Sequence, residues 1–140
     1  MTSSMTDDKK LVLLANLKAG YTFVLLPFII LVLIKLFHDK SWEAIFLAGD
    51  WSLASCILFG QNIASLSKAV VSRNKEVRAS IFVYYFSKRL IGVVVSLVVY
   101  VLMLFEPNLI LGGLQVAIFI WASVRYFTDG IVTEMLNDGK

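Results

Sequence analysis

The chain has 140 residues, of which 59% are hydrophobic and 16% are charged. A typical soluble domain has about 45 to 50% apolar and about 25% charged residues, because polar side chains must cover the surface that stays in water. Its single cysteine also excludes a framework of intrachain disulfides. The composition therefore excludes a soluble globular domain, a disordered chain and a disulfide-stapled domain, and it predicts an integral membrane protein.

Charged residues divide the sequence into four apolar segments, because a charge at the bilayer centre costs about 2.5 to 3.5 kcal/mol. Segments of 16 to 24 residues are too long for the strands of a membrane barrel, and an open sheet cannot cross lipid. We expect an all-α polytopic membrane protein of two helical hairpins, with four transmembrane helices over residues 19–37, 44–67, 85–105 and 109–127.

Residues 1–18 precede the first predicted helix and are expected to form a separate cytoplasmic segment. Within them, residues 9–18 mix lysines with aliphatic residues, a pattern that suits a short helix lying in the membrane interface. Acidic residues before the lysines, and the absence of a small-residue cleavage pattern, argue against a signal peptide. Pro27 should bend the helix over residues 19–37, because it removes a backbone hydrogen bond.

Residues 44–67 form the most polar of the four predicted helices. Small side chains recur at every fourth position, namely Ala48, Ser52, Cys56, Gly60 and Ala64. In lipid, such a stripe allows two helix backbones to approach closely. Two compatible interpretations stay open: the stripe packs against other helices of the same chain, or it forms the interface of a homo-oligomer.

The same helix carries intramembrane polar groups. Asp50 either forms a structural ion pair with Lys35 of the preceding helix or handles protons or ions. Gln61 and Asn62, with Gln115 in the last predicted helix, either hydrogen-bond between helices or line a wet path. Interhelical hydrogen bonds of this kind are worth about 0.6 kcal/mol on average.

The third and fourth predicted helices are separated only by Glu106, Pro107 and Asn108, which are turn residues and indicate a tight hairpin. The short connection between residues 37 and 44 indicates the first hairpin. A longer connection, the basic loop over residues 68–84, joins the two hairpins, and residues 128–140 form the predicted cytoplasmic tail.

Basic residues gather on one side of this arrangement. Eleven Lys and Arg residues fall on the side of the two termini and the basic loop, against two on the other side. Cytoplasmic loops carry such an excess, so the sequence predicts an inner-membrane protein with both termini in the cytoplasm. The basic side chains near the loop either reflect this bias alone or dock lipid head groups or a cytosolic protein partner: Lys68, Arg73, Lys75, Arg78, Lys88 and Arg89.

No catalytic pattern stands out in the sequence. His38 is the only histidine and is expected in an outer loop, and Cys56 has no second cysteine with which to form a redox pair or a thiolate site. We therefore expect no enzyme activity, no cofactor, no metal and no nucleic-acid partner. The expected partners are the lipid bilayer and further copies of the chain.

The second helix, SLASCILFGQNIASLSKAV, runs into a basic segment, VVSRNKEVR, which an aliphatic hairpin follows. This layout resembles small four-helix bacterial membrane proteins of phage exclusion and antiviral defence, of the RexB-like and Kiwa membrane-subunit kinds. The resemblance is one of architecture and implies a role in defence. The expected function is a homo-oligomer that alters ion permeability or senses membrane perturbation. Two alternatives stay open, a membrane anchor that recruits a cytosolic partner through the basic loop and a small-solute transporter.

Overall fold

The computed structural model describes residues 7–71 and 79–138, and the expected all-α fold class is confirmed there. The helices are α1 (Asp7–Asp39), α2 (Trp42–Phe46), α3 (Asp50–Val71), α4 (Ala79–Phe105) and α5 (Leu109–Asp138). Within these ranges, four helical stretches are long and apolar enough to cross a membrane, three of them in α1, α4 and α5, and the fourth from Trp42 to Lys68 across α2 and α3. These are the features of a membrane protein.

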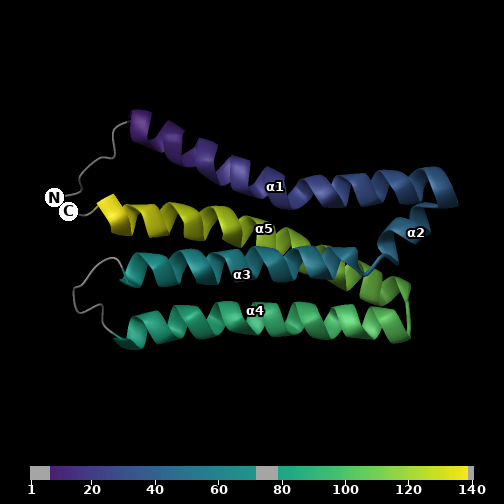
Figure 1. Cartoon of the computed structure of the whole chain (residues 1–140). Coiled ribbons are helices and arrows are strands. Elements are labelled where there is room, and N and C mark those ends of the chain that lie inside the picture. Colours follow the sequence, from purple (N-terminus) through teal and green to yellow (C-terminus); the bar gives the residue numbers. More distant parts are fainter. Residues whose placement is uncertain (1–6, 72–78, 139–140) are drawn as a thin grey trace.

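The four long helices lie side by side (Figure 1). The helix α3 contacts both α4 and α5 along much of its length, whereas α1 packs more loosely against α3 and α5. The start of α1 and the end of α5 lie at one end of the bundle, and α2 and residues 106–108 lie at the other (Figure 1). Near its middle α1 bends, and Pro27 lies inside it.

The start of the first predicted helix and the end of the last one differ in the structure. The helix α1 runs without a break from Asp7, so residues 9–18 are the first turns of the same helix rather than a separate interfacial one. Its first turns contain neither glycine nor proline, and lysine is a good helix former, so no residue there ends a helix. The last helix likewise continues past residue 127 to Asp138, through part of the predicted tail.

The predicted helix over residues 44–67 is interrupted. The short helix α2 ends at Phe46 and α3 begins at Asp50, so residues 47–49 form a break. Gly49 lies in this break and packs closely against the ring of Tyr100. A Cβ at position 49 would lie 3.3 Å from the nearest ring carbon. The predicted loop over residues 68–84 also shortens, since α3 extends to Val71 and α4 begins at Ala79.

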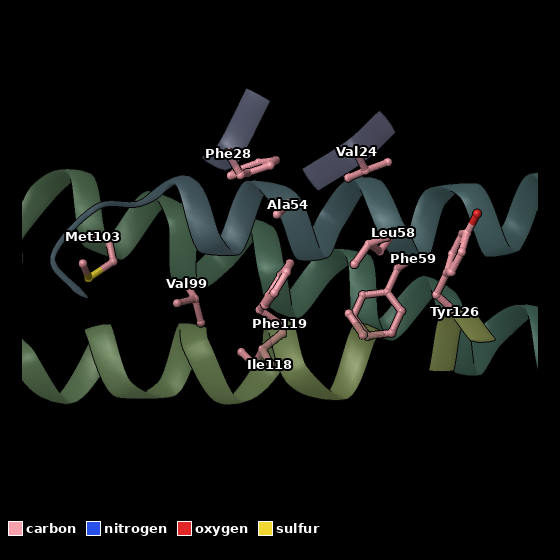
Figure 2. Packing of buried hydrophobic residues seen from close by; sticks show 11 residues of the cluster. Val24, Phe28, Ala54, Leu58, Phe59, Val99, Met103, Ile118, Phe119 and Tyr126 are labelled. Carbon is pink, nitrogen blue, oxygen red and sulfur yellow. The ribbon is translucent and has the colours of Figure 1, made fainter. Parts of the chain in front are cut away.

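Most of the buried hydrophobic side chains form one cluster between α3, α4 and α5, with α1 adding Val24 and Phe28 (Figure 2). At its centre Phe59 is fully buried and lies against Gly92, where a Cβ would approach the ring to 2.9 Å. Outside the cluster, many large apolar side chains are exposed on every long helix. A bundle with a narrow core and an apolar exterior suits lipid rather than water.

Candidate functional site

Three polar side chains meet inside the bundle, one from each of its three most closely packed helices. Arg89 of α4 donates hydrogen bonds to Asp129 of α5 through both Nε and Nη2, one to each carboxylate oxygen. Asn62 of α3 donates a longer hydrogen bond of 3.4 Å to the same carboxylate. We call Arg89, Asp129 and Asn62 the charged cluster.

Helix geometry brings these residues together. Asn62 follows the buried residues Leu58 and Phe59 by one turn, so it continues the face that α3 turns toward its neighbours. On α5, Asp129 lies one turn beyond Tyr126, which is also buried. On α4, Arg89 precedes Gly92 by one turn, on the face that contacts Phe59.

The charged cluster is largely buried. The exposed fraction of the Arg89 side chain is 3% and that of the Asp129 side chain is 22%, so Asp129 is the charged member that reaches the surface. Two opposite charges in a two-pronged pair are strongly attracted in such a low-dielectric setting. Arg89 Nη1 is buried and has no hydrogen-bond partner among the residues that the structure describes. The guanidinium is therefore held along one edge and unsatisfied at its other end.

The structure corrects the predicted role of Arg89. It was expected among the exposed basic residues that dock lipid or protein, but it is buried because it pairs with Asp129. Asp129 itself was missed, since the residues after 127 were assigned to a cytoplasmic tail. The spacing of the two residues in the sequence does indicate this pair. Arg89 lies 16 residues before Phe105, and Asp129 lies 20 residues after Leu109. Opposite charges at similar distances from one tight connection are expected to meet across a hairpin.

A second polar contact lies at the start of α3, whereas Asn62 of the charged cluster lies near its middle. Gln115 of α5 is fully buried, and its Nε2 donates hydrogen bonds of 2.7 Å to the carbonyl oxygens of Phe46 and Ala48. Ser52 Oγ donates to Gln115 Oε1 at 3.1 Å. We call this set the glutamine clamp. It satisfies backbone carbonyls that the break between α2 and α3 leaves without helical partners.

The structure brings Lys35 and Asp50 together. Lys35 Nζ lies 3.3 Å from Asp50 Oδ2, and both side chains are about one third exposed. Asp50 is the first residue of α3, where a carboxylate also interacts favourably with the positive end of the helix dipole. These contacts are those of the structural ion pair considered from the sequence.

The stripe of small residues divides into two parts. Ala48 and Ser52 are buried against other helices of the same chain. Cys56 and Gly60 are half-buried and Ala64 is exposed, and no described atom lies within 4 Å of the place that a Cβ of Gly60 would occupy. The first part therefore packs inside the chain, whereas the second part faces outward. We call Cys56, Gly60 and Ala64 the outward stripe.

The polar residues of α3 also separate. Asn62 joins the charged cluster, whereas the neighbouring Gln61 is half-exposed, and its side chain makes no hydrogen bond within the described ranges. Because successive helix residues are about 100° apart, Gln61 projects from a different side of α3 than Asn62. Of the three amides singled out in the sequence, Asn62 and Gln115 bond between helices.

The remaining basic residues are only partly described. Arg73, Lys75 and Arg78 lie outside the described residues. Lys68 is exposed, and so is Lys88, whose Nζ lies 5.8 Å from the centre of the Tyr84 ring. This distance allows a cation–π contact within α4.

A contact between α1 and α5 was not predicted. Tyr21 donates a hydrogen bond of 2.8 Å to Ser123 Oγ, and its ring lies against Tyr126 and Phe127. Gly20 admits the Tyr126 hydroxyl, which would be 2.5 Å from a Cβ at that position. Glycine at this site therefore allows α1 to approach α5 closely.

No protein-family model, no curated protein and no solved structure matches this chain.

Proposed function

We propose that the protein is a non-enzymatic integral membrane protein of the bacterial inner membrane that alters ion permeability as a homo-oligomer, in defence against phage. The observation that carries this proposal is the charged cluster. An ionised pair between three membrane-spanning helices is costly to bury, and such pairs in membrane proteins mark ion or proton pathways. Arg89, with 3% exposure, has the burial expected of such a group.

The outward stripe supports assembly with further copies. Its small side chains leave room for a second helix backbone to approach α3, and packing of this kind drives helix association in lipid. Gln61 lies next to Gly60 and its amide has no hydrogen bond within the described ranges. A second copy would give this amide a partner, which a lipid tail cannot do.

The proposed orientation has both termini in the cytoplasm, following the excess of basic residues on that side. The charged cluster then lies toward the cytoplasmic half of the bilayer, and the glutamine clamp lies toward the opposite half. A path across the bilayer would run along α3, between these two polar sets. Oligomerisation supplies the additional walls that such a path needs.

Ion flux from liposomes tests the proposal directly. Wild-type protein should dissipate a potassium gradient in vesicles at a rate well above that of empty vesicles. Asp129→Asn, which keeps the size of the side chain but removes its charge, should change that rate by about tenfold or more, because it alters the charge along the path. Asp50→Asn is the matched control, since it removes a carboxylate from the same bundle at a surface ion pair.

Cross-linking tests the assembly separately. Oxidation of native Cys56 with copper phenanthroline should yield a covalent dimer, and Gly60→Leu should abolish both the dimer and the flux, because a leucine side chain separates the two helices. A cysteine moved to the exposed position Val98 of α4, in a Cys56→Ser background, should not cross-link. Absence of flux from wild-type vesicles that contain cross-linkable oligomers would contradict the permeability function.

A further inference from the structure

One nitrogen of the Arg89 guanidinium group, Nη1, is buried without a hydrogen-bond partner among the described residues. The guanidinium group has five N–H donors, and Asp129 takes two of them, one on Nε and one on Nη2. Both donors of Nη1 are buried without a partner in the described part of the chain, and the side chain is 3% exposed. Buried donors in proteins are nearly always satisfied, so this end of Arg89 calls for an acceptor.

The geometry of the guanidinium group determines which N–H donors are open to that acceptor. Asp129 occupies the edge formed by Nε and Nη2, which leaves the edge formed by Nη1 and Nη2. This second edge is a planar fork of parallel N–H bonds, the arrangement with which arginine binds oxyanions and halides. The carboxylate on the first edge also fixes the plane of the guanidinium, so the second fork is already oriented.

The local charge favours an anion over a neutral acceptor. Within four residues of the charged cluster along its three helices, the cations are Lys88, Arg89 and Arg125, and the only acid is Asp129. This region therefore has a net charge of about +2 once Arg89 and Asp129 are paired. A bound monovalent anion would lower that charge by one, and attraction of this kind is strong where water is excluded.

We propose that the Nη1–Nη2 edge of Arg89 binds a small inorganic anion of halide size. Burial sets the size limit, since an Arg89 side chain with 3% exposure does not admit a lipid phosphate with its glycerol and acyl chains. Entry is beside Asp129, the charged member of the cluster that reaches the surface. The proposal stands on this geometry alone and holds whether or not the protein conducts ions.

Thermal unfolding of the full chain in a non-ionic detergent tests the site, with chloride as the probe and gluconate at equal ionic strength as the reference. Chloride binds the folded state and not the unfolded chain, so the unfolding midpoint should be at least about 2 °C higher in chloride, and the difference should saturate with concentration. Bromide should act like chloride. Equal midpoints in chloride and gluconate would overturn the proposal.

Three variants locate the effect. Arg89→Lys keeps a cation opposite Asp129 but lacks the second fork, so the chloride effect should vanish. Lys88→Gln is the matched control, because it removes one exposed positive charge from the adjacent position and should leave the effect intact. Asp129→Asn should enlarge the chloride effect, because it removes the repelling charge while the amide oxygen still accepts a hydrogen bond that orients the guanidinium. Equal loss in Lys88→Gln and Arg89→Lys, or a smaller effect in Asp129→Asn, would overturn the site. If Arg89→Lys does not fold, the sign of the Asp129→Asn change decides.

Discussion

Arg89 and Asp129 are stable inside the bundle only as a pair. Each would be very costly to bury alone, and the two-pronged contact, with Asn62 as an additional donor, offsets that cost. The energetic consequence is asymmetric. Loss of one partner leaves an uncompensated charge, whereas loss of both leaves only a gap that apolar side chains can fill.

Asp129→Leu should therefore lower the free energy of unfolding by about 3 kcal/mol or more. The double variant Arg89→Met, Asp129→Leu should recover much of that loss, because no unpaired charge is left in the bundle. Denaturant unfolding in detergent micelles measures the loss in Asp129→Leu, in the single variant Arg89→Met and in the double variant. A double variant whose loss equals the sum of the two single losses would show that the two side chains do not interact.

Gly92 offers a second test of a single side chain. A Cβ there would lie 2.9 Å from the ring of Phe59, which is fully buried. Gly92→Ala should cost about 1 to 3 kcal/mol through overpacking. Gly113→Ala is the matched control, since no described atom lies within 4 Å of its Cβ position, and it should be neutral or stabilising by up to about 1 kcal/mol. Equal effects of the two substitutions would contradict the packing seen around Phe59.

At the scale of elements, the break between α2 and α3 depends on a side chain from a distant helix. Gln115 donates to the carbonyl oxygens of Phe46 and Ala48 and accepts from Ser52, so the break is satisfied by α5 rather than by water. The carbonyl of Phe46 also comes within 2.7 Å of the place that a Cβ of Gly112 would occupy. The absence of a side chain at Gly112 lets α5 approach the end of α2.

Gln115→Leu should loosen this region without unfolding the bundle. The substitution keeps the bulk of the side chain but leaves two buried carbonyls without donors, at a cost of about 1 to 2 kcal/mol. Hydrogen exchange of the amides in α2 and the first turn of α3 should accelerate by about tenfold. Amides near Asn62 serve as the internal control, and acceleration there as well would show a global loss of stability instead.

The sequence predicts the elements better than their ends. Apolar runs bounded by charges locate four candidate spans, because the cost of charge in lipid is large and local. They do not locate the break at residues 47–49, where Gln115, 67 and 69 positions away, satisfies the carbonyls. The same limit applies to Arg89 and Asp129. Taken singly, each resembles the charged end of a span, and only their pairing shows that both lie inside.

At the scale of the whole molecule, the orientation in the membrane is still a prediction. Glu106→Cys and Asp8→Cys lie at opposite ends of the bundle and can be compared in a Cys56→Ser background. With both termini in the cytoplasm, a membrane-impermeant maleimide should label Glu106→Cys in intact cells and Asp8→Cys only after the cells are lysed. The reverse pattern would contradict the orientation inferred from the basic residues.

The two polar sets along α3 have a mechanical consequence. The glutamine clamp ties the first turn of α3 to α5. The hydrogen bond from Asn62 ties the middle of α3 to Asp129 of α5, which in turn binds Arg89 of α4. Sliding α3 by one turn, about 5.4 Å, would break the clamp and the Asn62 hydrogen bond at once. We therefore expect α3, α4 and α5 to stay in register as one unit. The helix α1 is joined to that unit by a surface ion pair, one tyrosine hydroxyl and few buried side chains, so displacement within the chain under stress from the bilayer should be concentrated in α1.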